Sequence, residues 1–122
     1  MAVLLVEGAS MFLVSVPLSV FGNVPHVDGA PRYRLLAAQE TPAAITTNAG
    51  ITMSAPHGLT SLSEADIVVV PTWSDPTRIP SRTLLDALRQ AHDRGTVVVG
   101  LCLGAFVLAH AGLLDGLAAT TH

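Results

Sequence analysis

Two runs of β-branched residues, separated by one amphipathic segment, constrain the fold more than any other feature of this sequence. Ile67–Val70 is β-branched throughout and stops at Pro71, and a similar run begins at Thr96 and continues to Leu101. Between them, Ser81–Arg94 places leucine and alanine on one helical face and charged residues on the other. A strand, a helix and a second strand in this order predict parallel pairing through a right-handed crossover. We therefore expect an α/β fold whose parallel sheet is buried beneath helices.

The rest of the chain continues this alternation with shorter signals. Further strands are predicted at Met1–Val6, at Tyr33–Ala38, in a hairpin-like excursion around Ile45 and Ile51–Met53, and at the start of Ala119–Thr121. Further helices are predicted over Phe12–Phe21, where Pro17 limits regularity, and over Gly104–Ala111. The long apolar run Val97–Leu114 is interpreted as a buried strand followed by a buried helix, and a membrane span is not expected.

Composition narrows the size and the partners of the protein. The chain has 122 residues, enough for one domain, and 50% of them are hydrophobic while 12% are charged. All six basic residues are arginine and the net charge is -3, so no positive face for nucleic acid is expected. The start of the chain is apolar but contains Glu7 and lacks a positive n-region, which argues against a secretory signal. A single cysteine excludes an intramolecular disulfide and indicates a cytoplasmic protein.

The segment Gly100–Gly104 carries the most specific chemical signal. It reads Gly-Leu-Cys-Leu-Gly and lies between a predicted strand and a predicted helix, which is the pattern of a nucleophile elbow. Glycines on both sides allow a sharp turn that exposes the side chain of Cys102. The alternative is a packed cysteine beside glycines that let a helix approach closely. The pattern alone leaves both interpretations open.

Other residue clusters indicate no cofactor. The histidines have neither the spacing nor the company of a metal site, and no metal is expected. The glycines form neither a dinucleotide-binding nor a Walker-type loop, so no nucleotide is expected either.

The elbow and its surroundings resemble the ThiJ/PfpI superfamily, the class I glutamine-amidotransferase-like proteins. The supporting stretches are GLCLGAFVLAHAGLLDGLAATTH, PLSVFG, PRYRLLAA, SAPHGL and ADIVVVPTW. Their order is most similar to the amino-terminal domain of AraC-type regulators of the GlxA and AdpA kind. This resemblance covers nearly the whole chain and implies a flavodoxin-like parallel sheet with helices on both faces. It also implies that residues 1–122 are one partial domain, incomplete at the C-terminus and without the separate helix-turn-helix domain that binds DNA.

The resemblance implies a site around the elbow. Cys102 matches the elbow cysteine and His122 the histidine that approaches it, whereas the position of the acidic partner is occupied by Leu13. Glu7 is either a substitute acid or a solvated side chain. The positions that stabilise an oxyanion read Thr72-Trp73, where Trp73 either lines a pocket or packs in the core. The expected ligand pocket comprises Glu7, Thr72, Trp73, Cys102 and Leu103.

Three functions remain open at this point. The first is a non-catalytic, ligand-sensing and dimerisation domain of an AraC-family regulator, which forms a homodimer, binds a small molecule, reaches DNA only through another domain and does not contact a membrane. The second is a small cysteine-dependent hydratase, amidase or glyoxalase-like enzyme, in which Cys102 attacks an electrophilic carbon and His122 moves protons. The absence of an acid at Leu13 argues against it. The third is a fragment without independent activity.

Overall fold

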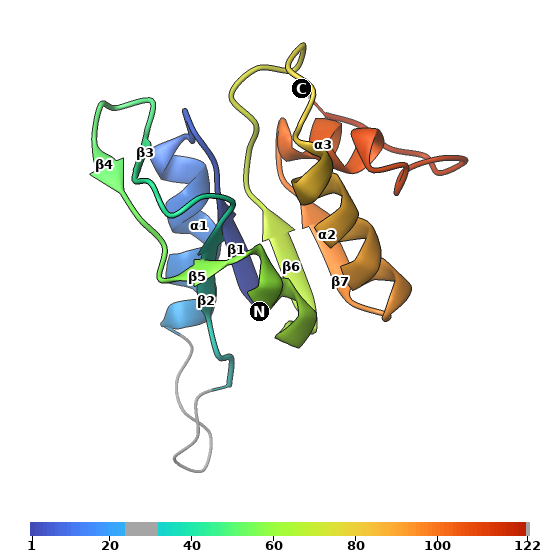
Figure 1. Cartoon of the computed structure of the whole chain (residues 1–122), viewed down its shortest axis with the longest axis horizontal. Coiled ribbons are helices and arrows are strands. Elements are labelled where there is room, and N and C mark those ends of the chain that lie inside the picture. The colour runs from blue at the N-terminus through green and yellow to red at the C-terminus, as the bar shows by residue number, and fades with distance from the viewer. Residues whose placement is uncertain (24–31, 122) are drawn as a thin grey trace.

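The computed structural model describes residues 1–23 and 32–121. Strands alternate with helices along the chain (Figure 1). In order, the elements are β1 (Ala2–Leu5), α1 (Met11–Gly22), β2 (Leu36–Gln39), β3 (Ile45–Thr46), β4 (Thr52–Met53), β5 (His57–Gly58), the 3-10 helix η1 (Leu59–Glu64), β6 (Ile67–Val70), α2 (Arg82–Asp93), β7 (Val97–Gly100) and α3 (Gly104–His110).

Five strands form one parallel sheet in the order β5-β2-β1-β6-β7. Their register is continuous: Ala2 lies opposite Leu36 on one side and opposite Val68 on the other, and Val68 lies opposite Val98. Strands β3 and β4 form a separate antiparallel pair, the hairpin-like excursion predicted from the sequence. The predicted α/β class and parallel sheet are confirmed.

Helices cover both faces of this sheet. Neighbouring side chains on a strand point to opposite faces, so each strand contributes to the packing on both. Val3 and Val69 belong to a cluster that packs against Leu18 and Phe21 of α1. Ala2, Leu4, Val68 and Val70 belong to a larger cluster on the other face, together with the buried residues of α2 and α3. The helices predicted on both faces are therefore present (Figure 1).

Helix α2 matches the prediction closely. The Ser81 side chain accepts a hydrogen bond from the Leu84 N–H and caps the first turn, while Gly95 follows the helix with a φ of 88°. The predicted apolar face is the buried face, formed by Leu84, Leu85, Leu88 and Ala91. Packing of this apolar face against the sheet removes both surfaces from water, which stabilises the fold.

The prediction that the strand within Thr96–Leu101 is buried is wrong. The strand β7 forms, but Val97 is 58% exposed and Val98, Val99 and Gly100 are only half-buried. The reason is its place in the sheet: β6 has a strand on each side, whereas β7 is an outer strand of the sheet as described. The helix after it is also only partly buried, with Ala109 and His110 exposed.

Other boundaries differ from the prediction in smaller ways. Strand β2 begins at Leu36, three residues after the predicted start at Tyr33, and residues 119–121 form no strand. Isolated extended residues gain no ladder hydrogen bonds, so a strand does not form where no neighbouring strand pairs with it. The short elements β5 and η1 were not anticipated from the sequence.

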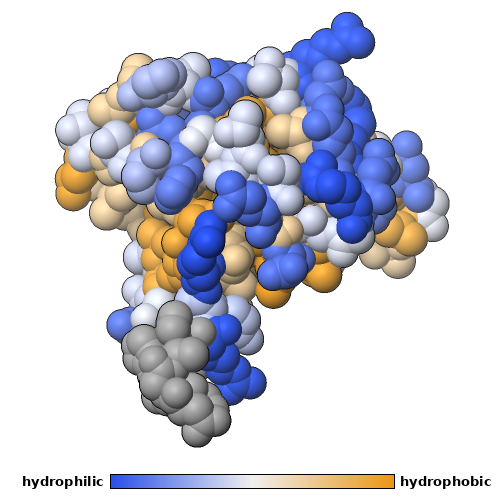
Figure 2. Space-filling model, turned by 60° about the horizontal axis from the view of Figure 1, so that its bottom comes forward, coloured by the Kyte–Doolittle hydropathy of each residue, from blue (hydrophilic) through white to orange (hydrophobic). Residues whose placement is uncertain are grey.

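Hydrophobic side chains reach the surface at several places. Figure 2 views the molecule from the end where the parallel strands begin and shows exposed hydrophobic groups among hydrophilic ones. The large exposed hydrophobic residues include Phe12, Val20, Ile51, Ile79, Val97 and Leu117. Within the described ranges, no helix is both long and apolar enough to cross a membrane.

Candidate functional site

The elbow is a sharp turn centred on Cys102. This residue has a φ of 51°, a left-handed conformation that a residue with a side chain rarely adopts, and it is half-buried. Gly104 begins α3, and a Cβ atom there would lie 2.2 Å from the Val70 carbonyl oxygen. At Gly100, a Cβ would lie 3.0 Å from the Ala105 nitrogen. Both flanking glycines therefore permit close approach of the backbone, and strain at Cys102 itself turns the chain.

Hydrogen bonds fix the elbow to the strand beside it and to the end of the chain. The Leu101 N–H donates to the Val70 carbonyl at 2.9 Å, and the Gly104 N–H donates to the Leu101 carbonyl at 2.7 Å. The Thr121 hydroxyl donates to the Cys102 carbonyl at 2.9 Å. The chain therefore returns to the elbow at Thr121. His122, the expected proton carrier, lies outside the described residues.

Leu13 and Glu7 are the two positions considered for an acidic partner of the elbow. Leu13 lies on α1 and is half-buried, so the position expected to carry an acid offers only hydrocarbon. Glu7 is exposed after β1, and its Oε2 accepts a hydrogen bond from the Thr46 N–H at 3.1 Å. The Glu7 carboxylate thus holds the end of β1 to the β3–β4 hairpin.

Thr72 and Trp73 follow β6 and are both buried. The Trp73 indole N–H donates to the Arg78 carbonyl at 2.8 Å, and the Arg78 guanidinium lies 5.5 Å from the centre of the indole ring. Hydrogen bonds from the Thr77 hydroxyl and N–H keep the pKa of Asp75 below its usual value. The loop after β6 is therefore a compact turn folded around the indole.

Two of the expected pocket residues, Glu7 and Trp73, line a cavity of about 210 Å³. Its lining does not include Thr72, Cys102 or Leu103. Instead, it includes Gln39, Glu40 and Arg78, which the sequence did not single out. Gln39 ends β2, Glu40 follows it, and Arg78 lies in the loop after β6, so these residues form no local sequence motif.

Gln39 builds one wall of this cavity. It is 3% exposed, its amide nitrogen donates to the carbonyls of Thr41 and Ala43, and its amide oxygen accepts from the Ala55 N–H. A buried amide with all these bonds fixes the loop after β2 in one shape. The Glu40 carboxylate then accepts a hydrogen bond from the Ser81 hydroxyl, which ties this loop to the start of α2.

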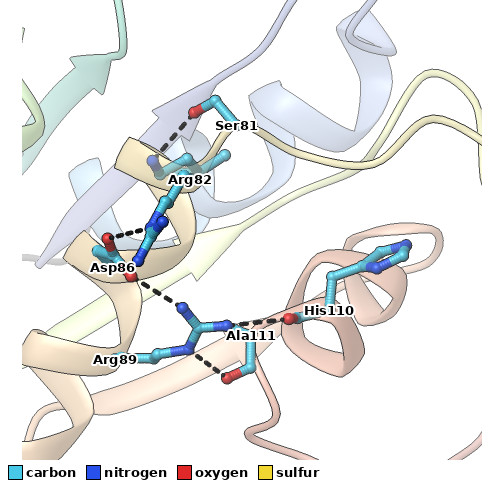
Figure 3. A network of polar contacts seen from close by, with 7 residues as sticks. Ser81, Arg82, Asp86, Arg89, His110 and Ala111 are labelled. Atoms are coloured by element: carbon cyan, nitrogen blue, oxygen red, sulfur yellow. Dashed lines mark hydrogen bonds and ion pairs between the residues drawn. The ribbon is translucent and has the colours of Figure 1, made fainter.

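Arg89 joins α2 to the helix that follows the elbow (Figure 3). Its guanidinium donates to the carbonyls of Ala111 at 2.9 Å and His110 at 3.2 Å, and it pairs with Asp86 at 2.8 Å. The carbonyls at the end of a helix lack partners within the helix and favour a cation. Arg89 therefore caps α3 from outside and helps to hold the elbow helix in place.

No metal centre is evident in residues 1–23 and 32–121, where His, Cys, Asp and Glu form no group of three or more suited to an ion. The two regions offer different groups: a half-buried thiol on a strained turn, and a cavity bordered by two carboxylates and a guanidinium.

Comparison with known proteins agrees with this geometry. The model of the DJ-1/PfpI family matches residues 1–122. The HTH-type transcriptional regulator CdhR of Pseudomonas aeruginosa is 34% identical over 91 residues, which cover 75% of this chain and 26% of CdhR. Two solved structures superpose on the fold, an AraC family transcriptional regulator from Pseudomonas putida and a putative transcriptional regulator from Vibrio parahaemolyticus. Their TM-scores are 0.78 and 0.81, at 24% and 20% identity.

The matches cover most of this chain but only part of each protein that it matches. Each superposition covers 99% of this chain and 65% of the solved chain, so this chain spans about two thirds of those structures and about a quarter of CdhR. At such identities the solved structures show a shared fold. Because the family match extends over all 122 residues and the fold agrees with it, this protein belongs to the DJ-1/PfpI family.

Proposed function

We propose that this chain is the ligand-sensing and dimerisation domain of an AraC-type transcription regulator. The similarity to CdhR carries the proposal, since 75% of this chain aligns with a named transcriptional regulator at 34% identity. In this proposal DNA is bound by a separate helix-turn-helix domain, because the chain has a net charge of -3 and no lysine. A regulator of this kind works in the cytoplasm.

The proposal treats the elbow as non-catalytic. A thiol that attacks an electrophile needs a group that activates it and manages its proton. Leu13 occupies the position where the family resemblance places an acidic partner, and a leucine side chain can neither ionise nor accept a hydrogen bond. The strained turn at Cys102 then serves to connect β7 and α3.

Dimerisation is supported by the exposed outer strand. Strand β7 has no charged residue and no proline, the usual devices that keep a sheet edge from pairing with another chain. Val97 adds a large exposed side chain beside this edge. A second copy of the chain can bury both, as would a strand that continues the sheet in a longer protein, and we propose a homodimer.

One observation favours a second function, a cysteine-dependent enzyme. The φ of 51° at Cys102 is a strained backbone conformation of the kind that often lies at reaction centres. In that alternative Cys102 acts as a nucleophile and His122 carries protons, in a hydratase, amidase or glyoxalase-like reaction.

Two measurements separate these functions. Fused to a monomeric helix-turn-helix domain in a reporter strain, the chain should restore operator binding by bringing two DNA-binding domains together. The purified chain should turn over neither methylglyoxal nor a p-nitroanilide amide faster than its Cys102→Ser variant. A fusion that is expressed but inactive would contradict the regulator, and turnover that depends on Cys102 would favour the enzyme.

A further inference from the structure

The cavity bordered by Glu7, Trp73 and Arg78 lies where the connections of the sheet diverge. From β1 the chain passes to β2 on one side, and the strand on the other side of β1 is β6. Residues that follow the carboxyl ends of β1, β2 and β6 all line this cavity. In open parallel sheets such a switch point is the usual place for a ligand.

The walls of the cavity suit a small molecule with an apolar part. The hydrophobic part of its lining, here called the apolar base, includes Leu4, Val6 and Leu84. The volume of about 210 Å³ is below the roughly 300–1,000 Å³ of pockets that hold drug-sized ligands. The occupant should therefore be a small metabolite.

The charged groups that line the cavity narrow the chemical class of the ligand. Arg78 forms no ion pair within 4 Å of any described carboxylate, although it interacts electrostatically with Asp75. Its backbone carbonyl accepts the Trp73 indole N–H, and its guanidinium lies over that ring. A guanidinium presents several N–H donors in a plane, which suits a carboxylate. Glu7 and Glu40 each use one carboxylate oxygen in the hydrogen bonds described above. Their negative charges favour a cationic group.

We propose that this cavity binds a small zwitterion of the α-amino acid class, with its carboxylate at Arg78, its ammonium group toward Glu7 and Glu40, and its side chain over the apolar base. A plain amine would leave the planar N–H donors of Arg78 without a ligand carboxylate, and the second negative charge of a dicarboxylate would face Glu7 and Glu40. This inference rests on the proposed sensing function and assigns the sensed ligand to a site separate from the elbow.

Trp73 provides the readout. It is the only tryptophan in the chain, it is 6% exposed, and it lines the cavity, so its fluorescence reports on the cavity. The probes are L-alanine and L-leucine, compared with their methyl esters and N-acetyl derivatives, which each lack one charge. Calorimetry measures the same affinities without depending on the indole.

The expected result is a saturable change with at least one amino acid, weakened about tenfold or more in its ester and in the Arg78→Gln variant, a loss on the order of 1.4 kcal/mol. Glu7→Gln and Glu40→Gln together should weaken it similarly. Arg82→Gln is the matched control, since the Arg82 side chain is 93% exposed outside the cavity, and Cys102→Ser is the control for the elbow. Both controls should bind as the original chain does.

Three results would overturn the proposal: no saturable binding of either amino acid, equal binding of the esters and N-acetyl derivatives, or loss of binding in Cys102→Ser but not in Arg78→Gln. Thermal unfolding of each variant verifies that it is folded, and Arg78→Lys, which keeps the charge without the planar donors, replaces Arg78→Gln if needed. A chain that dimerises the reporter but binds neither amino acid would contradict this inference alone. Binding without dimerisation would contradict the dimer instead.

Discussion

Strands β6 and β7 have nearly the same sequence and lie side by side, yet their surroundings differ. Ile67–Val70 pairs with Val97–Gly100 residue by residue in one parallel ladder. On β6, Val68 and Val70 are 0% exposed, whereas Val97 on β7 is 58% exposed. The difference comes from position: β1 and β7 flank β6, while β7 has one neighbour in the described sheet.

The loops that follow these strands also differ in burial. Trp73 follows the interior strand β6, is buried, and borders a cavity that residues after β1 and β2 also line. Cys102 follows the outer strand and is half-buried on a strained turn. The recognisable motif and the cavity thus lie at the ends of different strands.

The largest effect is expected where the elbow helix touches the end of β6. Gly104→Ala places a Cβ 2.2 Å from the Val70 carbonyl oxygen, a backbone atom that cannot turn aside. We expect a loss of about 3 kcal/mol or more in the free energy of unfolding, measured by urea denaturation. Gly58→Ala is the control, because a Cβ there meets no atom within 4 Å. A similarly small effect for both variants would show that α3 does not pack closely on β6.

The two strands themselves should respond unequally to the same truncation. Val70→Ala removes buried methyl groups and should lower the free energy of unfolding by about 2 kcal/mol. Val97→Ala removes groups that are largely in water, so it should change this free energy by less than about 0.5 kcal/mol. Equal losses in denaturation experiments would mean that β7 is as buried as β6.

The contrast between β6 and β7 also shows which features the sequence alone could predict and which it could not. The periodicity of leucine and alanine predicted the buried face of α2, and the β-branched run predicted β6, because both signals are local. The same kind of run could not tell a central strand from an outer one, since burial depends on neighbours distant in the chain. The elbow could be predicted from the sequence because Gly100, Cys102 and Gly104 lie within five consecutive residues. The cavity was not, because Gln39, Glu40 and Arg78 meet only after the strands have paired.

A smaller effect is expected at the bridge between α2 and α3. Arg89→Met keeps much of the aliphatic stem but removes the bonds to the His110 and Ala111 carbonyls and the pair with Asp86. With this side chain 42% exposed, solvent weakens the charge contribution, so we expect a loss of about 1 kcal/mol in thermal or urea unfolding. Arg82→Met, at a side chain 93% exposed, should stay within about 0.5 kcal/mol of the original chain. If the two variants lose equal stability, Arg89 does not brace the elbow helix.

The smallest effect on stability, with a clear effect on association, is expected from Val97→Lys. A lysine beside an outer strand disfavours pairing with another copy, while the exposed position tolerates the charge. Light scattering should show less self-association at unchanged unfolding free energy, within about 0.5 kcal/mol. The same substitution at Val69, which is 3% exposed, should unfold the chain. Undiminished association of Val97→Lys would place the contact between copies elsewhere.

Hydrogen exchange of single amides tests most directly the claim that β7 is the outer strand of the sheet that the described residues form. The Val97 and Leu101 N–H groups donate to carbonyls of Asp66 and Val70, and because such bonds alternate along a strand, those of Val98 and Gly100 face away from β6. In the Val97→Lys variant, where a second copy should not cover the edge, we expect rapid exchange at Val98 and Gly100 and slow exchange throughout β6. Equal protection of both strands in a monomeric sample would contradict it.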